Sequence, residues 1–334
     1  MNKVFTYIDL FSGCGGFSLG FDNQNYQNIF SLDFEPSFCK TYKFNFPNHK
    51  LIEKDICNLT EQEISGIVGK KKVNVIIGGP PCQGFSMAGK IGRKFIDDPR
   101  NNLFKEFSRI INIIKPEIFV MENVQRLSIH NKGKTKLEML SEFESIGYNV
   151  DARVLDAVNY GAPQFRKRII FIGTINQKNI QFPSLPSEYI FEKRTISDAI
   201  NHFPPLKSGE SSNIPNHTAM NHADQMLKKM SYIGDGGSRI MIPEKLRPTS
   251  GDARKYIKYD SKKPSIPITG DMRKVFHYSQ NRALTVRELA SIQTFPDNFI
   301  FKGSSISQQQ QVGNAVPPIL AEAIAKCVKS MLEK

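Results

Sequence analysis

The chain has 334 residues, with 45 Lys and Arg against 32 Asp and Glu, which gives a formal net charge of +13. A composition with 40% hydrophobic and 23% charged residues is typical of a globular protein with a sizeable core, and it excludes fibrous and disordered classes. No apolar run approaches the ~18 to 20 residues of a membrane span, and the first residues enter a strand-like run without a signal-peptide pattern. We therefore expect a cytoplasmic protein with no membrane partner.

The cysteines and the net charge leave the partner open. Five cysteines are widely spaced and form no CxxC pair, so they indicate neither a disulfide framework nor a zinc site, and no metal is expected. A positive net charge favours a polyanion such as nucleic acid, because Lys and Arg displace counterions from phosphates. It is equally typical of a surface tuned for solubility, so composition alone does not decide.

The first half of the chain alternates between short β-branched or aromatic runs and longer amphipathic segments. The runs predict strands at Val4–Leu10, Asn28–Asp33, Val73–Ile77, Glu117–Met121 and Arg168–Thr174. Apolar spacing predicts helices at Glu35–Phe46, Leu103–Ile114 and Lys136–Ile146. Alternation of this kind predicts βαβ units and therefore an α/β fold with a doubly wound open sheet.

The character of the chain changes near Pro183. Residues 185–275 hold eight of the 19 prolines, show little periodicity and carry 15 Lys and Arg against 10 Asp and Glu. We expect three parts: a first domain at 1–183, a smaller loop-rich domain at 184–275, and a C-terminal segment at 276–334 that returns to the first domain. The last segment contains two predicted helices, Thr285–Phe295 and Ile319–Leu332.

The first motif is a glycine-rich turn that follows the first predicted strand, Tyr7-Ile-Asp-Leu-Phe-Ser-Gly-Cys-Gly-Gly-Phe17. Glycine lets a backbone approach a ligand closely at such a turn. Asp33 follows 20 residues after Gly13, at the end of the next predicted strand, where an acid commonly accepts hydrogen bonds from ribose hydroxyls. The pattern indicates an adenosine-bearing cofactor, and it is not the dinucleotide GxGxxG pattern.

Two more motifs place reactive side chains after later strands. Cys82 lies in Gly78-Gly-Pro-Pro-Cys-Gln83, a stiff polar loop in which a nucleophile is favoured over a core thiol. Glu122 ends an apolar strand, where an ionised carboxylate needs a partner or a task. Ligands of open α/β sheets bind outside the carboxyl ends of the strands, so Cys82, Glu122 and the Gly13 turn are expected to share one crevice.

The fourth motif is Gln164-Phe-Arg-Lys-Arg168, just before the last predicted strand. In an extended segment Gln164, Arg166 and Arg168 share one face, so Arg166 is expected to reach the crevice. A solvated basic edge strand is the alternative.

Together these motifs resemble the bacterial cytosine-C5 DNA methyltransferases, and the match runs through the chain in that family's usual order. The residues that carry it are Asp9-Leu-Phe-Ser-Gly-Cys-Gly-Gly16, Pro80-Pro-Cys-Gln83, Glu122-Asn-Val124, Gln164-Phe-Arg-Lys-Arg168, Arg287-Glu288 with Phe295-Pro-Asp297, and Gln311-Val-Gly-Asn-Ala-Val-Pro-Pro318. The resemblance implies a doubly wound mixed sheet, the S-adenosylmethionine-dependent methyltransferase fold, with 184–275 as the target-recognition domain.

The resemblance also implies the roles of the site residues. Cys82 would add to C6 of a flipped-out cytosine, Glu122 would bond its N3 and amino group, Arg166 would hold its O2 side, and Arg168 would support the loop. The cofactor would be S-adenosylmethionine, leaving as S-adenosylhomocysteine. Its implied binding residues are Phe11, Gly13, Gly15, Phe17, Asp33, Phe34, Asp55, Ile56, Pro80, Leu103, Asn314 and Val316.

The implied partner is double-stranded DNA carrying a short specific site, bound by a monomer that acts in a restriction-modification system beside a separate cognate endonuclease. A tRNA cytosine-C5 methyltransferase of the same family is the alternative. A dinucleotide oxidoreductase would explain Gly13 and Asp33 but not Cys82 or Glu122, and a non-catalytic homologue would be expected to lack one of those two.

Overall fold

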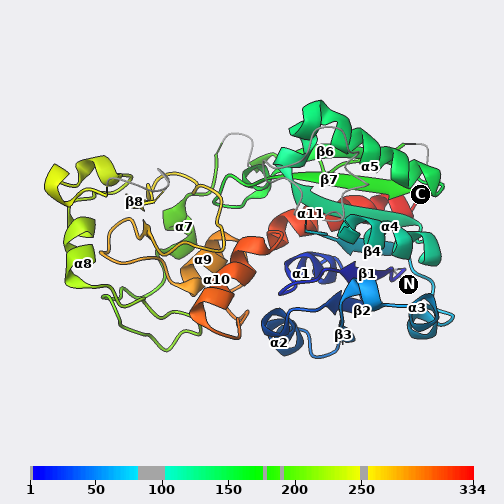
Figure 1. The fold of residues 1–334 in the computed structure, drawn as a ribbon, viewed down its shortest axis with the longest axis horizontal. Helices are drawn as coiled ribbons and strands as arrows, with labels where there is room; N and C mark the ends of the chain where they lie inside the picture. The colour runs from blue at the N-terminus through cyan, green and yellow to red at the C-terminus, as the bar shows by residue number, and fades with distance from the viewer. Residues whose placement is uncertain (1–2, 82–101, 176–178, 189–191, 249–254) are drawn as a thin grey trace. The chain divides into compact units, whose positions relative to one another are not determined.

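The computed structural model of the protein describes residues 3–81, 102–175, 179–188, 192–248 and 255–334. The chain forms two compact units (Figure 1). Unit 1 consists of Met1–Asp156, Lys167–Ser184 and Leu320–Lys334, and unit 2 consists of Ala157–Arg166 and Leu185–Ile319.

Unit 1 is built on a sheet of seven strands in the order β3-β2-β1-β4-β5-β7-β6. The strands β1 to β5 run parallel, and β7 runs antiparallel to both of its neighbours. Their bounds are β1 Thr6–Leu10, β2 Gln27–Asp33, β3 Leu51–Glu53, β4 Val75–Gly78, β5 Ile118–Val124, β6 Asn149–Asp156 and β7 Lys167–Thr174. The predicted doubly wound mixed sheet is thus confirmed.

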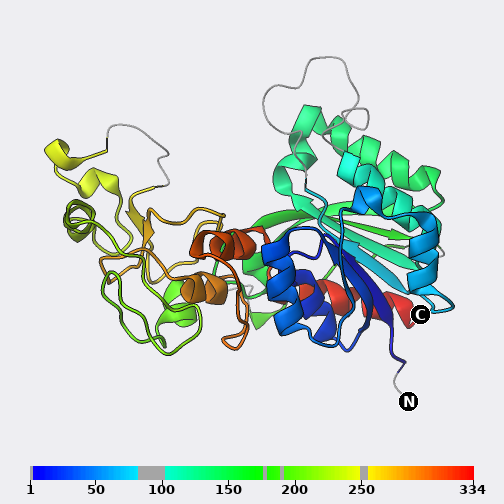
Figure 2. The ribbon, with the colours of Figure 1, turned by 60° about the horizontal axis from the view of Figure 1, so that its bottom comes forward.

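Helices cover both faces of this sheet. The helices of unit 1 are α1 Gly16–Asp22, α2 Pro36–Asn45, α3 Glu61–Val68, α4 Asn102–Ile114, α5 Lys134–Ser145 and α11 Pro318–Leu332, with the short turns η1 Ile56–Asn58 and η5 Gln125–Gly133. Figure 2 shows α1 (dark blue) and α11 (red) on one face and α5 (green) on the other.

Side chains that alternate along β1 explain the two layers. Tyr7 packs its ring against Phe21 of α1, whereas Ile8 enters the core that α4 and α5 share. On that second face the rings of Phe104 and Phe143 meet edge to face, with centroids 5.4 Å apart.

Unit 2 is small and rich in loops, with its own apolar cluster of Met230, Ile233, Ile242 and Phe276. Its regular elements are η6 Ala157–Tyr160, α7 Ile196–Ile200, α8 Asp224–Ser231, η7 Arg239–Met241, η8 Glu244–Leu246, β8 Ile257–Lys258, β9 Val275–Phe276, α9 Val286–Ile292 and α10 Ser305–Asn314.

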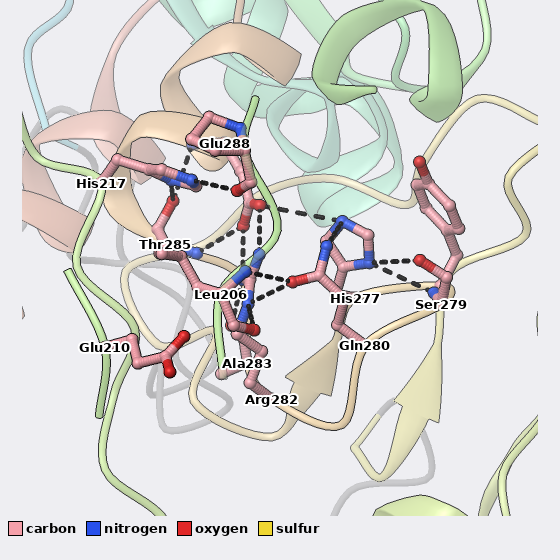
Figure 3. A network of polar contacts seen from close by, with 12 residues as sticks. Leu206, Glu210, His217, His277, Ser279, Gln280, Arg282, Ala283, Thr285 and Glu288 are labelled. Carbon is pink, nitrogen blue, oxygen red and sulfur yellow. Dashed lines mark hydrogen bonds and ion pairs between the residues drawn. The ribbon is translucent and has the colours of Figure 1, made fainter. Parts of the chain in front are cut away.

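A buried ion pair organises unit 2 around the start of α9 (Figure 3). Arg282 donates from Nη1 and Nη2 to the two carboxylate oxygens of Glu288, at 2.8 and 2.6 Å, and both side chains are buried. Burial opposes ionisation of Glu288, but the bonds from Arg282 outweigh it, so the pKa of Glu288 lies below its usual value. Burial lowers the pKa of the adjacent His277 to about 4, which keeps that ring neutral at pH 7.

The C-terminal boundary differs from the expected one. Residues 276–319 belong to unit 2, and only Leu320–Lys334 rejoin the sheet of unit 1. The helix α9 packs on α7, where Ser291 Oγ donates to the carbonyl of Ala199 at 2.8 Å. Contacts between segments about 90 residues apart in sequence therefore decide this boundary.

Candidate active site

The carboxyl ends of the five parallel strands place the predicted site residues along one edge of unit 1. In the order of the strands across the sheet, Asp55 comes after β3, Asp33 ends β2, Gly13 follows β1, Pro80 follows β4, and Glu122 lies near the carboxyl end of β5. Sheet order, not sequence order, thus arranges these residues in one row at the edge where α/β proteins bind ligands.

The turn after β1 has left-handed backbone conformations at Phe11, Gly13 and Gly15, with φ of 64°, 56° and 99°. The two glycines serve different purposes. A Cβ at Gly15 would overlap the ring of Phe46, whereas a Cβ at Gly13 would meet nothing within 4 Å. The open side of the turn at Gly13 is therefore where a ligand can approach the backbone.

Asp33 holds this turn in place. Its Oδ2 accepts from the backbone nitrogen of Gly13 at 2.7 Å, and its Oδ1 accepts from that of Glu35 at 2.9 Å. Burial raises the pKa of Asp33 despite these bonds. Each carboxylate oxygen can accept a second bond, so Asp33 keeps the capacity to bind a hydroxyl.

The next residue, Phe34, leaves the core. Its side chain is 61% exposed although it directly follows a buried strand. Core packing, the alternative to a ligand contact, is thus excluded for Phe34, and its ring offers a flat apolar face beside Asp33.

The other predicted cofactor residues of unit 1 are partly structural. Asp55 caps η1 by accepting from the backbone nitrogen of Cys57 through Oδ1 at 2.9 Å. Ile56, Pro80 and Phe17 are buried. Leu103 packs against the main core of unit 1.

Glu122 and Arg168 form the charged centre of the edge. Arg168 Nε lies 2.6 Å from Glu122 Oε1, and both side chains are mostly buried. The register places Arg168 opposite Val124, because β7 runs antiparallel to β5 and begins where β5 ends. A planar guanidinium beside a carboxylate fixes the orientation of both groups.

Two neighbours of this pair were not predicted. Asn123 donates from Nδ2 to the carbonyl of Pro80 at 3.0 Å, and its Oδ1 accepts from the backbone of Val124 at 2.9 Å. A Cβ at Gly79 would lie 3.2 Å from Glu122 Oε2, so glycine leaves room for the carboxylate. The run Glu122-Asn-Val124 and the glycine pair before Pro80 were the available signals.

Asp9 is a third residue to which the sequence analysis assigned no role. It is fully buried on β1, and its Oδ2 accepts from Ser18 Oγ at 2.6 Å. Burial, opposed by the bond from Ser18 and assisted by Asp33 and Asp22, raises the pKa of Asp9 to about 8. The site therefore rests on a carboxyl group that is largely protonated at pH 7.

The structure places the two arginines differently from the expectation. The guanidinium of Arg166, expected to reach the crevice, is buried in unit 2 and donates to the carbonyls of Ile268, Gly313 and Ala315 at 2.8, 2.6 and 3.1 Å. Arg168, expected only to support the loop, is the residue on Glu122. Alternation placed both on one face, but β7 starts at Lys167 and Arg166 precedes it.

Three predicted residues remain predictions. Cys82 lies outside the described residues, which end at Pro81 on that side. Asn314 and Val316 belong to unit 2, where Asn314 is exposed at the end of α10 and Val316 is buried. Among the described residues, no group of three His, Cys, Asp or Glu side chains could hold a metal ion.

A glycine turn braced by Asp33, an exposed ring after β2 and a buried acid–arginine pair on β5 and β7 thus lie along one edge of an α/β sheet. The sequence model of the C-5 cytosine-specific DNA methylases matches residues 5–330, and the chain belongs to that family. It is therefore an enzyme that methylates cytosine at C5, and a dinucleotide oxidoreductase is excluded.

Individual relatives agree over the whole chain. The Type II methyltransferase M1.HphI of Haemophilus parahaemolyticus is 58% identical over 98% of this chain and 87% of its own length. The Type II methyltransferase M.DdeI of Desulfomicrobium norvegicum is 35% identical over 98% of this chain and 89% of its own.

Solved structures share the fold. A prophage-encoded protein of E. coli superposes with a TM-score of 0.80 at 24% identity, over 99% of this chain and 100% of that one. The Entamoeba histolytica methyltransferase EhMeth gives 0.72 at 17%, over the full length of both chains. In the part of this chain that is described, no helix is both long and apolar enough to cross a membrane.

Proposed function

We propose that this enzyme methylates C5 of one cytosine within a short specific site of duplex DNA, as the protective half of a type II restriction-modification system. The observation that carries the proposal is the Glu122–Arg168 pair at the sheet edge that also bears the glycine turn. The family and the relatives named Type II methyltransferases support DNA as the substrate and restriction-modification as the context.

The residues at the edge fit S-adenosylmethionine. Phe34 offers an exposed ring on which adenine can stack, and the open backbone at Gly13 suits the methionyl part. The carboxylate of Asp55 can accept a further bond, from the adenine amino group, because each of its oxygens accepts two. Asp33 would accept from the ribose hydroxyls. When bound, S-adenosylmethionine supplies an electrophilic methyl group on a sulfonium.

The remaining residues of unit 1 that are assigned to the cofactor would line or shape the same proposed pocket. They are Phe11, Gly15, Phe17, Ile56, Pro80 and Leu103. Asn314 and Val316 of unit 2 are assigned to the cofactor by the family resemblance. Phe17 and Ile56 are buried and Leu103 is half-buried against the core, so their part is to shape the pocket walls. Phe11, whose backbone is left-handed, helps to set the course of the turn that carries Gly13.

The chain's own residues then act on the cytosine. The Cys82 thiolate adds to C6, and Glu122 stabilises the charge that builds on the ring by sharing a proton with N3. Arg168 orients Glu122 and adds positive potential on the O2 side, the role first expected of Arg166. Once C5 carries the methyl group, a base removes its proton, the C6–S bond breaks and Cys82 leaves as thiolate.

Arg166 and Asn123 do not contact the reacting atoms in this proposal. Each holds backbone carbonyls near other assigned residues. Arg166 ties together three carbonyls of unit 2, one next to Asn314 and one next to Val316. Asn123 fixes the carbonyl of Pro80, two residues before Cys82. The base must be flipped out of the duplex for either Cys82 or Glu122 to reach it, at a cost of a few kcal/mol.

The Cys82→Ala variant tests the proposal. We expect it to retain binding of target DNA and to lose methylation, measured by bisulfite sequencing of DNA from cells that express it. The matched control is Cys327→Ala, which removes a half-buried thiol on α11 and should keep full activity. Full methylation by Cys82→Ala would refute the nucleophile.

The substrate class is tested with the wild-type protein. Duplex DNA carrying 5-fluorocytosine at the target should trap a covalent adduct, because fluorine blocks the final elimination. Methylation of tRNA but not of duplex DNA would select the RNA enzyme instead. For the biological role, we expect the protein to protect host DNA from a cognate endonuclease. For assembly and location, we expect a monomer in sedimentation and recovery in the cytoplasmic fraction of cells.

A further inference from the structure

Unit 2 presents two large apolar side chains to solvent on a single tight turn, η7. Ile240 is 71% exposed and Met241 is 50% exposed, whereas the next residue, Ile242, is fully buried in the apolar cluster of the unit. We call the segment Ser238–Arg247 the tip. In the tip, the side chain of Ile242 is thus buried in the core of unit 2, whereas the side chains of Ile240 and Met241 face solvent.

The tip is held rigidly from both sides. The backbone nitrogens of Met241 and Ile242 donate to the carbonyls of Ser238 and Arg239, at 3.0 and 3.2 Å. Before the turn, Gly237 packs so closely that a Cβ there would lie 2.5 Å from Met241 Sδ and 2.9 Å from the carbonyl of Gly234. The exposed side chains are thus displayed on a fixed backbone, which lowers the entropy cost of binding.

Arg247 places a positive charge at the base of Ile240. Its Nη2 donates to the carbonyl of Ile240 at 2.9 Å, and its Nε donates to that of Ile242 at 3.1 Å. Lys245 is exposed beside it. Among the described residues, no carboxylate lies within ion-pair distance of Arg247 or Lys245. The tip also holds Arg239 and the exposed carboxylate of Glu244, so its net charge is +2. It therefore combines two exposed apolar side chains with a net positive charge.

We propose that Ile240 and Met241 contact the methyl group of a thymine in the major groove of the target DNA, while Lys245 and Arg247 contact flanking phosphates. An aliphatic side chain cannot hydrogen-bond to a base edge, and the one apolar feature that distinguishes base pairs in that groove is the thymine methyl. This inference rests on the proposed function, because it takes duplex DNA as the substrate.

The charge of the tip favours DNA over a second copy of the chain. Two exposed side chains cover far less than the ~800 Å² per partner of a stable protein interface. With Glu244 included, the net charge of the tip is +2, which would repel the tip of a symmetric copy and complements a phosphate backbone. Self-association through Ile240 is therefore the alternative that an experiment must exclude.

The test replaces single thymines of the target site by uracil, which removes only the C5 methyl group. The site is first identified by bisulfite sequencing, and kcat/KM is then measured on each duplex. Wild type should lose about fourfold at one thymine, the effect of one apolar carbon group. Ile240→Ala should methylate the thymine duplex more slowly and should no longer distinguish it from the uracil duplex at that position.

Two control variants separate the tip from general surface effects. Ile306→Ala removes an isoleucine of unit 2 that is 55% exposed on α10, and it should discriminate thymine from uracil as wild type does. Lys245→Gln should weaken binding to all sequences and reduce the slope of log affinity against log salt by about one.

Several results would overturn the inference. These are a wild-type enzyme that is indifferent to every thymine-to-uracil change, an Ile240→Ala variant that discriminates as wild type does, or loss of a dimer on Ile240→Ala in sedimentation without DNA. Failure of the proposed function would look different, because the wild-type protein would then methylate no duplex at all.

Discussion

The buried carboxyl group of Asp9 makes the stability of the protein fall as pH rises. In the unfolded chain Asp9 releases its proton near pH 4, whereas in the folded protein its pKa is about 8, because burial disfavours the charge. Between these values the folded state binds one more proton than the unfolded state. Asp9 therefore contributes its full stabilisation below about pH 4 and loses it progressively up to about pH 8.

The magnitude follows from the same shift. Each pH unit in this window costs about 1.4 kcal/mol, so the total effect is on the order of 5 kcal/mol at pH 8. The asparagine of Asp9→Asn cannot ionise, so the variant should lose this contribution to the slope of unfolding free energy against pH. Any destabilisation by the amide itself would be the same at every pH. The amide would put a donor at Oδ1, which has no hydrogen-bond partner among the described residues.

Urea unfolding at pH 5, 6, 7 and 8 measures the difference between wild type and Asp9→Asn. The matched control is Asp260→Asn. The bond from Lys263 lowers the pKa of this half-buried aspartate, so it is ionised in both the folded and the unfolded state throughout this range. The free-energy difference between wild type and Asp9→Asn should change by several kcal/mol across the series. Parallel curves for the two proteins would refute the raised pKa of Asp9.

Three further substitutions test the site and its support. Arg282→Met removes the cation from the buried ion pair of unit 2 and should lower the free energy of unfolding by about 3–5 kcal/mol in urea titrations. Gly79→Ala brings a methyl group against the carboxylate of Glu122, so kcat should fall by up to about tenfold with little change in Tm; unchanged kcat would contradict the crowding. Phe34→Ala should weaken S-adenosylmethionine binding by about 5- to 150-fold in calorimetry without destabilising the fold, whereas the similarly exposed Phe44→Ala should bind normally.

The strands that carry the site were predictable because each is a compact local pattern. All five predicted strands coincide with strands of the sheet. The bounds of β1, β2, β4 and β7 were predicted to within two residues at each end, whereas β5 ends at Val124, three residues beyond the predicted end. The strand β3 was not predicted because it has only three residues, and β6 was not predicted because every second side chain faces outward on an edge strand. Their neighbours in the sheet, and not their own sequences, make them strands.

The arginines show where local reasoning stops. Alternation put Arg166 and Arg168 on one face but did not pair Arg168 with Glu122. The antiparallel pairing of β7 with β5 brings these two side chains together. Alternation could not place Arg166, whose partners Ile268 and Gly313 lie 102 and 147 residues away in sequence. Long-range hydrogen bonds to backbone carbonyls leave no pattern in the side chains around them.

The sequence by itself determined the class of fold and the family, and it predicted Cys82 and Glu122 as the reactive residues, because catalysis demands particular side chains at particular strand ends. Only the tertiary structure decided that Arg168 rather than Arg166 pairs with Glu122, that Asn123 and Gly79 shape the site, and where the chain rejoins unit 1. The physical reason is that burial, ion pairing and packing depend on which distant segments meet. A local pattern records the secondary structure and the chemistry of a residue, but not its neighbours in space.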